Sequence, residues 1–226
     1  MTIAPRQHAL PLVGSAKSRR LAPFSAATDY RPIHVSNYER RGRDHYATPP
    51  WVTEALLRHV SFRGPIWEPC CGSGAISTVL SAQGYDVIST DIADCGFGTP
   101  GADFLASRSV RADCRSIITN PPYGEAATEA GQPRSSKAML EFLRHALAPT
   151  ATVQGQLALL VRLQWIAGQR VAEVMTAAPF RAVLVLTRRI RWFDMGERTN
   201  AGQHHHAWVV FDHAHPPEKP PVLLYA

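Results

Sequence analysis

The sequence predicts an α/β protein with a mostly parallel sheet that carries helices on both faces. Segments that favour strands alternate with segments that favour helices, and such alternation is typical of sheets built from strand–helix–strand units. Two of the strand segments end in polar residues, and ligands bind at strand ends in open α/β sheets. With 226 residues, 45% of them hydrophobic, the chain can bury one sizeable core.

Each predicted element rests on a local pattern. Short runs rich in aliphatic and β-branched residues predict strands at 65–69, 86–91, 116–119, 156–162, 181–187 and 206–212. Apolar residues that repeat along one face predict helices at 74–83, 137–147 and 164–177. A further helix is expected to begin near Trp51, because Pro49 and Pro50 suit a helix entrance and Val52 and Leu56 share a face.

A glycine-rich turn joins the first predicted strand to the helix at 74–83. Gly72 and Gly74 let the backbone turn tightly and approach a ligand that a Cβ would obstruct. The following strand ends in Asp91, about 20 residues further on, and a carboxylate there is placed to bind ribose hydroxyls. Without Asp91, an ordinary connection between a strand and a helix would explain the glycines equally well.

The strand at 116–119 stops at the sequence Asn120-Pro121-Pro122-Tyr123. The two prolines lack backbone N–H groups, so the strand cannot continue its hydrogen-bond ladder. An amide, two carbonyls and an aromatic ring are therefore left at a strand end.

The glycine turn, the acidic strand end and Asn-Pro-Pro-Tyr, in this order, resemble class I amino-methyltransferases that use S-adenosylmethionine. The match covers roughly residues 44–212 and is greatest to small phage or prophage N6-adenine DNA methyltransferases. It implies a Rossmann-like class I methyltransferase fold with a seven-stranded sheet, and S-adenosylmethionine as the cofactor. The residues that it implies for cofactor binding are Tyr46, Thr48, Pro49, Glu68, Pro69, Cys70, Gly72, Gly74, Asp91, Ile92, Asp103 and Asn120.

Some of these residues have specific roles in the family. By resemblance, Tyr46, Thr48 and Pro49 would line the methionine end of the cofactor. An acidic residue after the second strand commonly accepts a hydrogen bond from the adenine amine, which points to Asp103, with Asp113 as a rival.

The catalytic group implied by the resemblance is Asn120, Pro121, Pro122 and Tyr123. An exocyclic amine is a poor nucleophile because its lone pair is delocalised into the ring. Acceptors such as Asn120 Oδ1 and the Pro121 carbonyl would localise that lone pair and stabilise the positive charge that grows on nitrogen. Tyr123 would stack on the base, which must be flipped out of a duplex or supplied single-stranded.

The motif chemistry leaves other acceptors open. Related enzymes methylate RNA bases or a glutamine amide in proteins, and a non-catalytic nucleic-acid-binding protein could use the same scaffold. The form of the glycine turn, the Tyr-x-Thr-Pro element and a basic N-terminal arm favour DNA adenine. Only 103 residues follow Tyr123, too few for a full target-recognition domain as well as the core, so a partner protein could supply sequence recognition. The oligomeric state is not predicted.

The basic arm spans residues 1–43, and the methyltransferase domain is expected at 44–226 with a proline-rich, extended tail from about 214. The arm holds eight basic and two acidic side chains, which account for the whole net charge of +6. It either meets phosphates or is a solvated leader without a partner.

A second basic segment follows the strand at 181–187. Three guanidiniums beside aromatic rings could grip phosphates and stack on bases, and the candidate nucleic-acid contacts are Arg188, Arg189, Arg191, Trp192 and His206, with Trp208 as an alternative to His206. The competing interpretation is a sheet edge with Trp192 and Phe193 in the core. The polar stretch 124–137 either folds over substrate or is a plain connection.

Metal binding and membrane insertion are not expected. His204-His205-His206 has no carboxylate cluster or cysteine pair to complete a metal site, and no apolar run approaches the roughly 20 residues that span a bilayer. The four cysteines lack paired spacing, and a reduced, cytoplasmic protein is expected.

Overall fold

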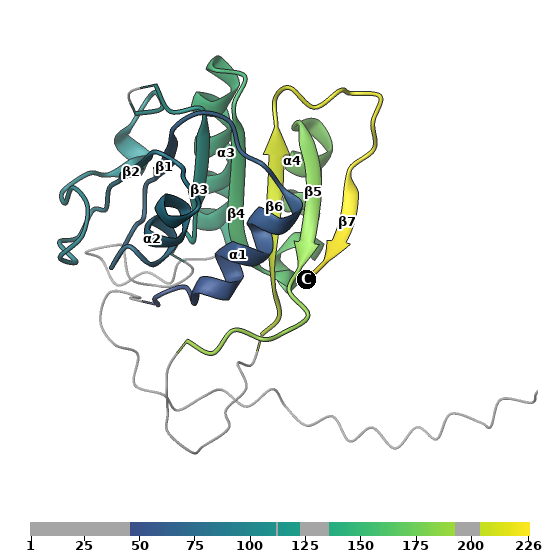
Figure 1. Ribbon diagram of the computed structural model, residues 1–226. Helices are drawn as coiled ribbons and strands as arrows, with labels where there is room; N and C mark the ends of the chain where they lie inside the picture. The colour runs from purple at the N-terminus through teal and green to yellow at the C-terminus, as the bar shows by residue number, and fades with distance from the viewer. Residues whose placement is uncertain (1–45, 112, 123–135, 193–203) are drawn as a thin grey trace, which may run out of the picture. The chain divides into compact units, whose positions relative to one another are not determined.

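The computed structural model of the protein describes residues 46–111, 113–122, 136–192 and 204–226 (Figure 1). Seven strands of this part form one sheet in the order β2-β1-β3-β4-β6-β5-β7. The strands are β1 (Ile66–Glu68), β2 (Val87–Ser89), β3 (Ser116–Thr119), β4 (Gln156–Arg162), β5 (Phe180–Val185), β6 (His206–Asp212) and β7 (Val222–Tyr225). All run in one direction except β6, which is antiparallel to β4 and β5. The predicted mostly parallel sheet is confirmed.

Four α-helices of the described residues cover the two faces of this sheet. They are α1 (Pro50–His59), α2 (Ala75–Ala82), α3 (Ser136–Thr152) and α4 (Gln169–Ala177). Residues of α1 and α2 belong to one apolar core, and residues of α3 and α4 belong to a second core on the opposite face (Figure 1). Helices on both faces were predicted, and this arrangement confirms them.

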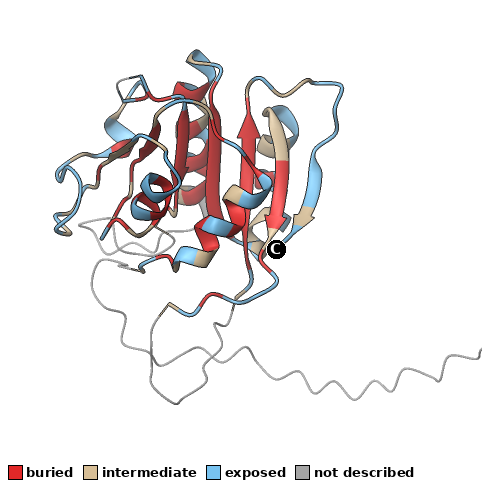
Figure 2. Cartoon of the chain, viewed as in Figure 1, coloured by how far each residue is buried: buried red, intermediate tan, exposed pale blue. Residues whose placement is uncertain are grey.

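Alternation along the central strands explains the two cores. Ile118 and Leu160 lie in the core under α1 and α2, whereas their neighbours Ile117 and Leu159 lie in the core under α3 and α4. All seven residues of β6 are buried, so its apolar run is covered on both sides (Figure 2).

Three differences from the predicted elements exceed one or two residues at the end of an element. The helix predicted at 164–177 is split by Gly168, whose extended backbone separates a 3-10 helix at Leu163–Ala167 from α4. Helix α3 runs through Pro149 to Thr152, and the Thr150 hydroxyl donates to the carbonyl oxygens of Ala146 and Leu147. The segment expected to be an extended tail ends in β7, which pairs with β5; the six runs noted in the sequence did not include this strand.

An ion-pair cluster closes the edge of the sheet at which the parallel strands begin. Arg63, before β1, donates to both carboxylate oxygens of Asp212 at 2.6 and 3.2 Å, and its backbone N–H donates to Gln156 at the start of β4. Arg181 also contacts Asp212 at 3.3 Å. These contacts join the segment before β1 to the start of β4, to β5 and to the end of β6. No helix of the described segments has the length and apolar character needed to cross a membrane.

Candidate active site

The predicted ligand-binding segments meet at the edge where the parallel strands end. The chain leaves β1 toward β2 on one side and leaves β3 toward β4 on the other side, so the direction of the connections reverses between β1 and β3. Ligands bind at such a switch point in open α/β sheets. The glycine turn follows β1, Asp91 follows β2 and Asn120 follows β3. The fold therefore brings together three segments that are distant in the sequence.

Asp91 connects the end of β2 to the glycine turn. Its Oδ2 accepts from the Gly72 backbone N–H at 2.8 Å, and its Oδ1 accepts from Ala93 N–H at 2.9 Å. A carboxylate offers about four lone-pair sites, so each oxygen keeps capacity for a further donor. Ile92, directly after Asp91, is 65% exposed and presents an apolar surface at the same edge.

The two glycines of the turn have different surroundings. Both have positive φ angles, +52° at Gly72 and +80° at Gly74, a backbone region that favours glycine. A Cβ at Gly74 would lie 2.5 Å from the ring of Phe97, whereas a Cβ at Gly72 would have no atom of the described residues within 4 Å. A Cβ at Gly74 would thus displace the Phe97 ring, and Gly72 borders open space that a ligand could fill.

Glu68 lies inside the protein rather than at its surface. It is 1% exposed, and its Oε2 accepts hydrogen bonds from both the backbone N–H, at 2.8 Å, and the hydroxyl of Ser77 in α2. Ser77 in turn contacts the Ser89 hydroxyl of β2 at 2.5 Å. Burial raises the pKa of Glu68 to about 8, against the lowering effect of the Ser77 bonds. Glu68 therefore holds the first turn of α2 against β1.

The rest of the turn is also mostly enclosed. Pro69 is buried and Cys70 is half-buried. Desolvation raises the pKa of the Cys70 thiol well above its ordinary value, so Cys70 is a neutral packing group rather than a nucleophile.

Asn120 carries a buried polar atom that lacks a hydrogen-bond partner among the described residues. Its Nδ2 donates to Thr48 Oγ1 at 3.2 Å, while its Oδ1 is buried and has no hydrogen-bond partner among the described residues. Buried carbonyl oxygens usually have a partner, so Oδ1 is suited to accept from a ligand. Pro121 is buried and Pro122 half-buried beside it; the predicted Tyr123 lies outside the described residues.

Tyr46 belongs to a group of three rings beside Thr48. The Tyr46 and Trp192 rings are 5.7 Å apart, and the Trp192 and His206 rings are 5.3 Å apart, both edge to face. His206 is 3% exposed, and burial, assisted by the nearby Arg162 charge, lowers its pKa to about 4. His206 is therefore a neutral ring at physiological pH. Pro49, at the entrance of α1, is half-buried.

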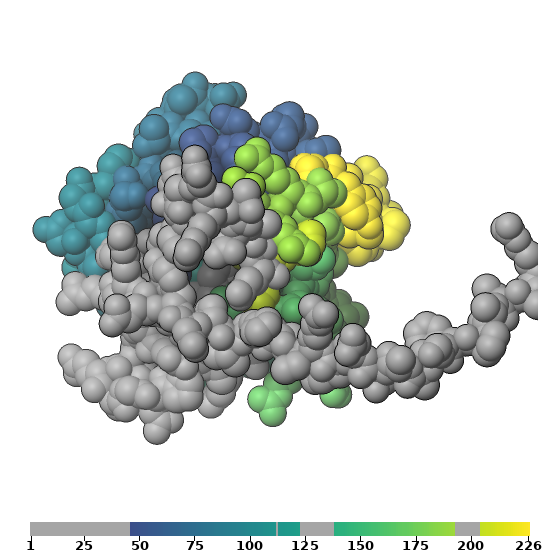
Figure 3. Space-filling view, turned by 90° about the horizontal axis from the view of Figure 1, so that it is seen from below, coloured from purple at the N-terminus to yellow at the C-terminus, as the bar shows by residue number. Residues whose placement is uncertain are grey.

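The segment after β5 contains exposed arginines and one buried apolar residue, and Phe193 lies outside the described residues. Arg188, Arg189 and Arg191 are exposed, whereas Ile190 is fully buried in the core and Trp192 packs against it. The Arg188 guanidinium lies 5.0 Å above the Trp51 ring, and Arg189 Nε donates to His205 at 3.2 Å. Figure 3 looks onto the edge of the sheet at which the parallel strands end. It shows the residues after β5, in light green, between α1 (blue) and the C-terminal strand (yellow).

Trp208 is a core residue, so the suggestion that it contacts a base is wrong. It is fully buried, and its indole N–H donates to the Val52 carbonyl of α1 at 2.9 Å.

The two candidate acids for the adenine amine lie at opposite edges of the sheet. Asp103 is exposed and follows Ala102, whose N–H donates to the Asp91 carbonyl at 3.0 Å. One Asp103 oxygen caps the 3-10 helix Phe104–Ala106. Asp113 lies before β3, where Arg115 N–H donates to Pro65 before β1. The position of Asp103 therefore favours it over Asp113.

Two residues that shape the candidate site were not identified from the sequence. Ser77 satisfies Glu68, and Phe97 packs its ring over Gly74. The signal for Phe97 was present, since it stands between Gly96 and Gly98 shortly after Asp91, a setting typical of a loop near a ligand. Ser77 has no such signal, because a serine in a helix is usually solvated.

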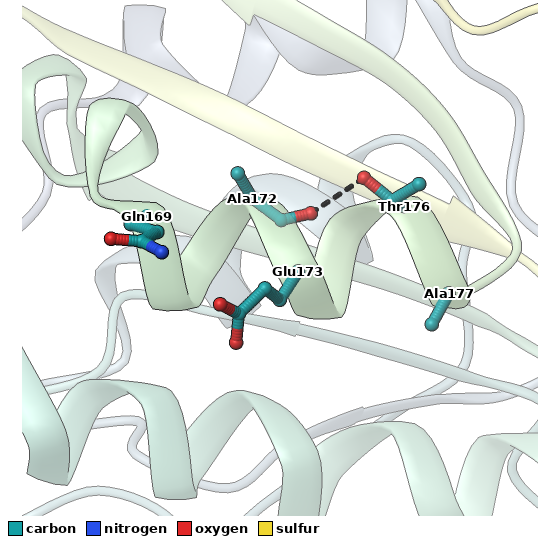
Figure 4. Close-up of a pocket in the computed structure, with 5 residues that line it drawn as sticks. All are labelled: Gln169, Ala172, Glu173, Thr176 and Ala177. Atoms are coloured by element: carbon teal, nitrogen blue, oxygen red, sulfur yellow. Dashed lines mark hydrogen bonds between the residues drawn. The ribbon is translucent and has the colours of Figure 1, made fainter.

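A surface hollow on α4 is unrelated to these residues. It has a volume of about 510 Å³ and is lined by Gln169, Ala172, Glu173, Thr176 and Ala177 (Figure 4). One helix supplies the whole lining, and Figure 4 shows the Thr176 hydroxyl turned back to the Ala172 carbonyl. Within the described residues, no group of three or more histidine, cysteine or acidic side chains could hold a metal ion.

Comparison with known proteins identifies the fold. No protein-family model matches the chain, and no curated protein matches it significantly. The modification subunit of a putative type I restriction enzyme from Vibrio vulnificus YJ016 aligns with a TM-score of 0.51 and 13% identity over 81% of this chain and 47% of its own. The M protein of the type I restriction enzyme EcoKI aligns with a TM-score of 0.50 and 15% identity over 74% and 44%.

A putative hemolysin from Lactococcus lactis also aligns, with a TM-score of 0.50 and 12% identity over 76% of this chain and 89% of its own. The chain spans about half the length of the two restriction-enzyme subunits. At such identities the likeness concerns the fold, and that fold is the Rossmann-like fold of class I methyltransferases.

Proposed function

We propose that the chain binds S-adenosylmethionine and transfers its methyl group to an exocyclic amino nitrogen of a nucleobase, N6 of adenine in DNA. The observation that carries this proposal is the Asn120 amide at the end of β3. Its nitrogen is held by Thr48, and its buried oxygen has no partner in the described structure.

The residues beside Asn120 fit the cofactor. The space over Gly72 is open among the described residues, and the Asp91 carboxylate keeps lone pairs for ribose hydroxyls. The exposed Ile92 side chain offers an apolar contact for an adenine ring. When bound, the cofactor supplies a methyl group already activated on a sulfonium.

Asn120 would act on the acceptor amine. Its Oδ1 would accept one amine N–H and the Pro121 carbonyl would accept the other, so the nitrogen lone pair localises. Both dipoles also stabilise the positive charge that develops on nitrogen, and their effect is largest in the transition state. The remaining requirement is alignment of the amine with the methyl group. Tyr123, by the family resemblance, would stack on the base.

A nucleic acid is the proposed source of that amine. Arg188, Arg189 and Arg191 are exposed at the same edge of the sheet as Asn120, where they could contact phosphates on both sides of an extruded base. The names of two structures with this fold also describe restriction-enzyme modification subunits. A DNA acceptor is consistent with both observations.

The test is transfer of labelled methyl groups to DNA, RNA and whole-cell protein in parallel, followed by nucleoside analysis. We expect N6-methyladenine in DNA. Asn120→Ala should lower turnover at least about 100-fold, as loss of one transition-state donor or acceptor does in other enzymes. Calorimetry should show that Asn120→Ala binds S-adenosylmethionine with nearly the affinity of the wild type. Label found in RNA or in protein glutamine would identify a different acceptor from DNA adenine. Turnover at the wild-type rate by Asn120→Ala would reject the mechanism.

A further inference from the structure

One hydrogen bond joins the entrance of α1 to the end of β3. Asn120 Nδ2 donates to Thr48 Oγ1 at 3.2 Å across 72 residues of sequence. Thr48 is 3% exposed, so water has little access to compete for this contact. The bond therefore links the Tyr-x-Thr-Pro element directly to the amide that we assign to the acceptor amine.

The direction of this bond decides what the amide presents to a ligand. An asparagine side chain ends in an acceptor oxygen and a donor NH2 group, and rotation about its last bond exchanges them. With Nδ2 bonded to Thr48, Oδ1 is the atom left without a described partner. The opposite rotamer would turn N–H groups toward the acceptor amine, and two donors cannot bond to each other.

We propose that Thr48 is a positioning residue that holds the Asn120 amide with its oxygen directed at the acceptor amine. The inference rests on the proposed methyl transfer and goes beyond the cofactor contact that the resemblance implies for Thr48. The hydroxyl touches neither reacting atom; it restricts rotation of the side chain that does.

The segment around Thr48 is held by other contacts as well. Tyr46 packs against Trp192, and Val52 N–H donates to the Pro49 carbonyl at 3.0 Å at the start of α1. Removal of one hydroxyl therefore leaves the backbone of this segment in place. The chain also offers a matched control in Thr53, which is fully buried in α1 and whose hydroxyl has no hydrogen-bond partner among the described residues.

Three variants separate the role of the hydroxyl from packing. Thr48→Val keeps the branched shape and removes the hydroxyl, and it should lower kcat about 10- to 100-fold, the range expected when a reacting group is misaligned. Thr48→Ser keeps the hydroxyl and should retain a rate close to that of the wild type. Thr53→Val removes a hydroxyl without a partner and should leave kcat unchanged.

The affinity for S-adenosylmethionine distinguishes this role from cofactor binding. Calorimetry should give the same Kd for Thr48→Val and wild type. A kcat that survives in Thr48→Val, equal losses in the valine and serine variants, or a weakened cofactor Kd that accounts for the loss would each overturn the inference.

A thermal double-mutant cycle tests the contact without any activity. Because Thr48→Val and Asn120→Ala remove the same interaction, the Tm loss of the double variant should be smaller than the sum of the single losses. Additive losses would reject the contact. Absence of methyl transfer by the wild type would instead reject the proposed function and the catalytic role of Thr48, so the two failures are distinguishable.

Discussion

At the scale of the residue, the site holds two carboxyl groups in contrasting surroundings. Asp91 is half-buried and accepts two backbone N–H groups at the surface of the turn, whereas Glu68 is enclosed beneath it with Ser77. Desolvation disfavours the charged form of a buried acid, and the pKa of Glu68 is raised from 4.5 to about 8. Glu68 is therefore largely protonated at neutral pH, and its ionisation opposes folding.

The raised pKa of Glu68 predicts a specific pH dependence of the free energy of unfolding. Between about pH 4.5 and 8 the folded protein keeps a proton on Glu68 that the unfolded chain has lost, so this group makes the free energy of unfolding fall as pH rises. Glu68→Gln cannot ionise and should flatten that fall. The measurement is urea unfolding of both proteins at pH 5, 7 and 8.5.

The wild type and Glu68→Gln must be compared at each pH, because His206 also makes stability depend on pH. Its pKa is lowered to about 4, so it adds stability as pH rises from 4 toward 6.5, and it does so equally in both proteins. The difference between wild type and Glu68→Gln thus isolates Glu68. A difference that does not change with pH would contradict the raised pKa.

At the scale of the element, the turn between β1 and α2 assigns separate tasks to its two glycines. Both have positive φ angles, which cost other residues about 1–2 kcal/mol. Of the two, Gly74 also lies under the ring of Phe97, and Gly72 borders a space that holds no atom of the described residues. One glycine therefore serves packing and the other serves access to a ligand.

Alanine substitutions should separate these tasks. Gly74→Ala should lower Tm more than Gly72→Ala, because its Cβ would overlap the Phe97 ring. Gly72→Ala should weaken S-adenosylmethionine binding strongly with a small loss of Tm, because its Cβ would enter the space assigned to the cofactor. Thermal melts and calorimetry measure both effects.

A second-site variant provides the control. Phe97→Ala should recover part of the Tm lost in Gly74→Ala and none of that lost in Gly72→Ala. Equal Tm losses at the two glycines, or a normal cofactor Kd for Gly72→Ala, would contradict this division of tasks.

At the scale of the whole molecule, charge is distributed unevenly along the chain. Residues 44–226 carry equal numbers of basic and acidic groups, and residues 1–43 carry the entire net charge of +6. The arm lies outside the described residues, so its role follows from its charge alone. A basic arm that neutralises phosphates releases counterions, which makes DNA affinity strongly dependent on salt.

Deletion of residues 1–40 should therefore weaken DNA binding and give a shallower slope of log affinity against log salt. S-adenosylmethionine binding should persist, because the glycine turn and Asp91 lie downstream. Titrations of DNA at several salt concentrations measure the slope. A full-length variant with Arg6, Lys17, Arg19 and Arg20 changed to glutamine is the matched control for chain length. Identical slopes for all three proteins would favour the inert leader.

The sequence predicted the central fold well because its signals are local. The strands at 116–119, 156–162 and 206–212 have the predicted bounds, since each is a dense apolar run. It missed β7, because Val222–Tyr225 follows a proline-rich stretch and becomes a strand only by pairing with β5. It also placed one helix across Gly168, where the backbone is extended.

The sequence by itself determined the chemistry available to this protein: two glycines after one strand, a carboxylate after the next and an amide after a third. Residue type and order suffice for these, because strand ends in parallel sheets meet at one edge. Tertiary structure alone decided how each group is used. It buried Glu68 against Ser77 and Trp208 against α1, and it brought Thr48 to Asn120. Burial and long-range hydrogen bonds depend on neighbours that only folding supplies, so no local pattern encodes them.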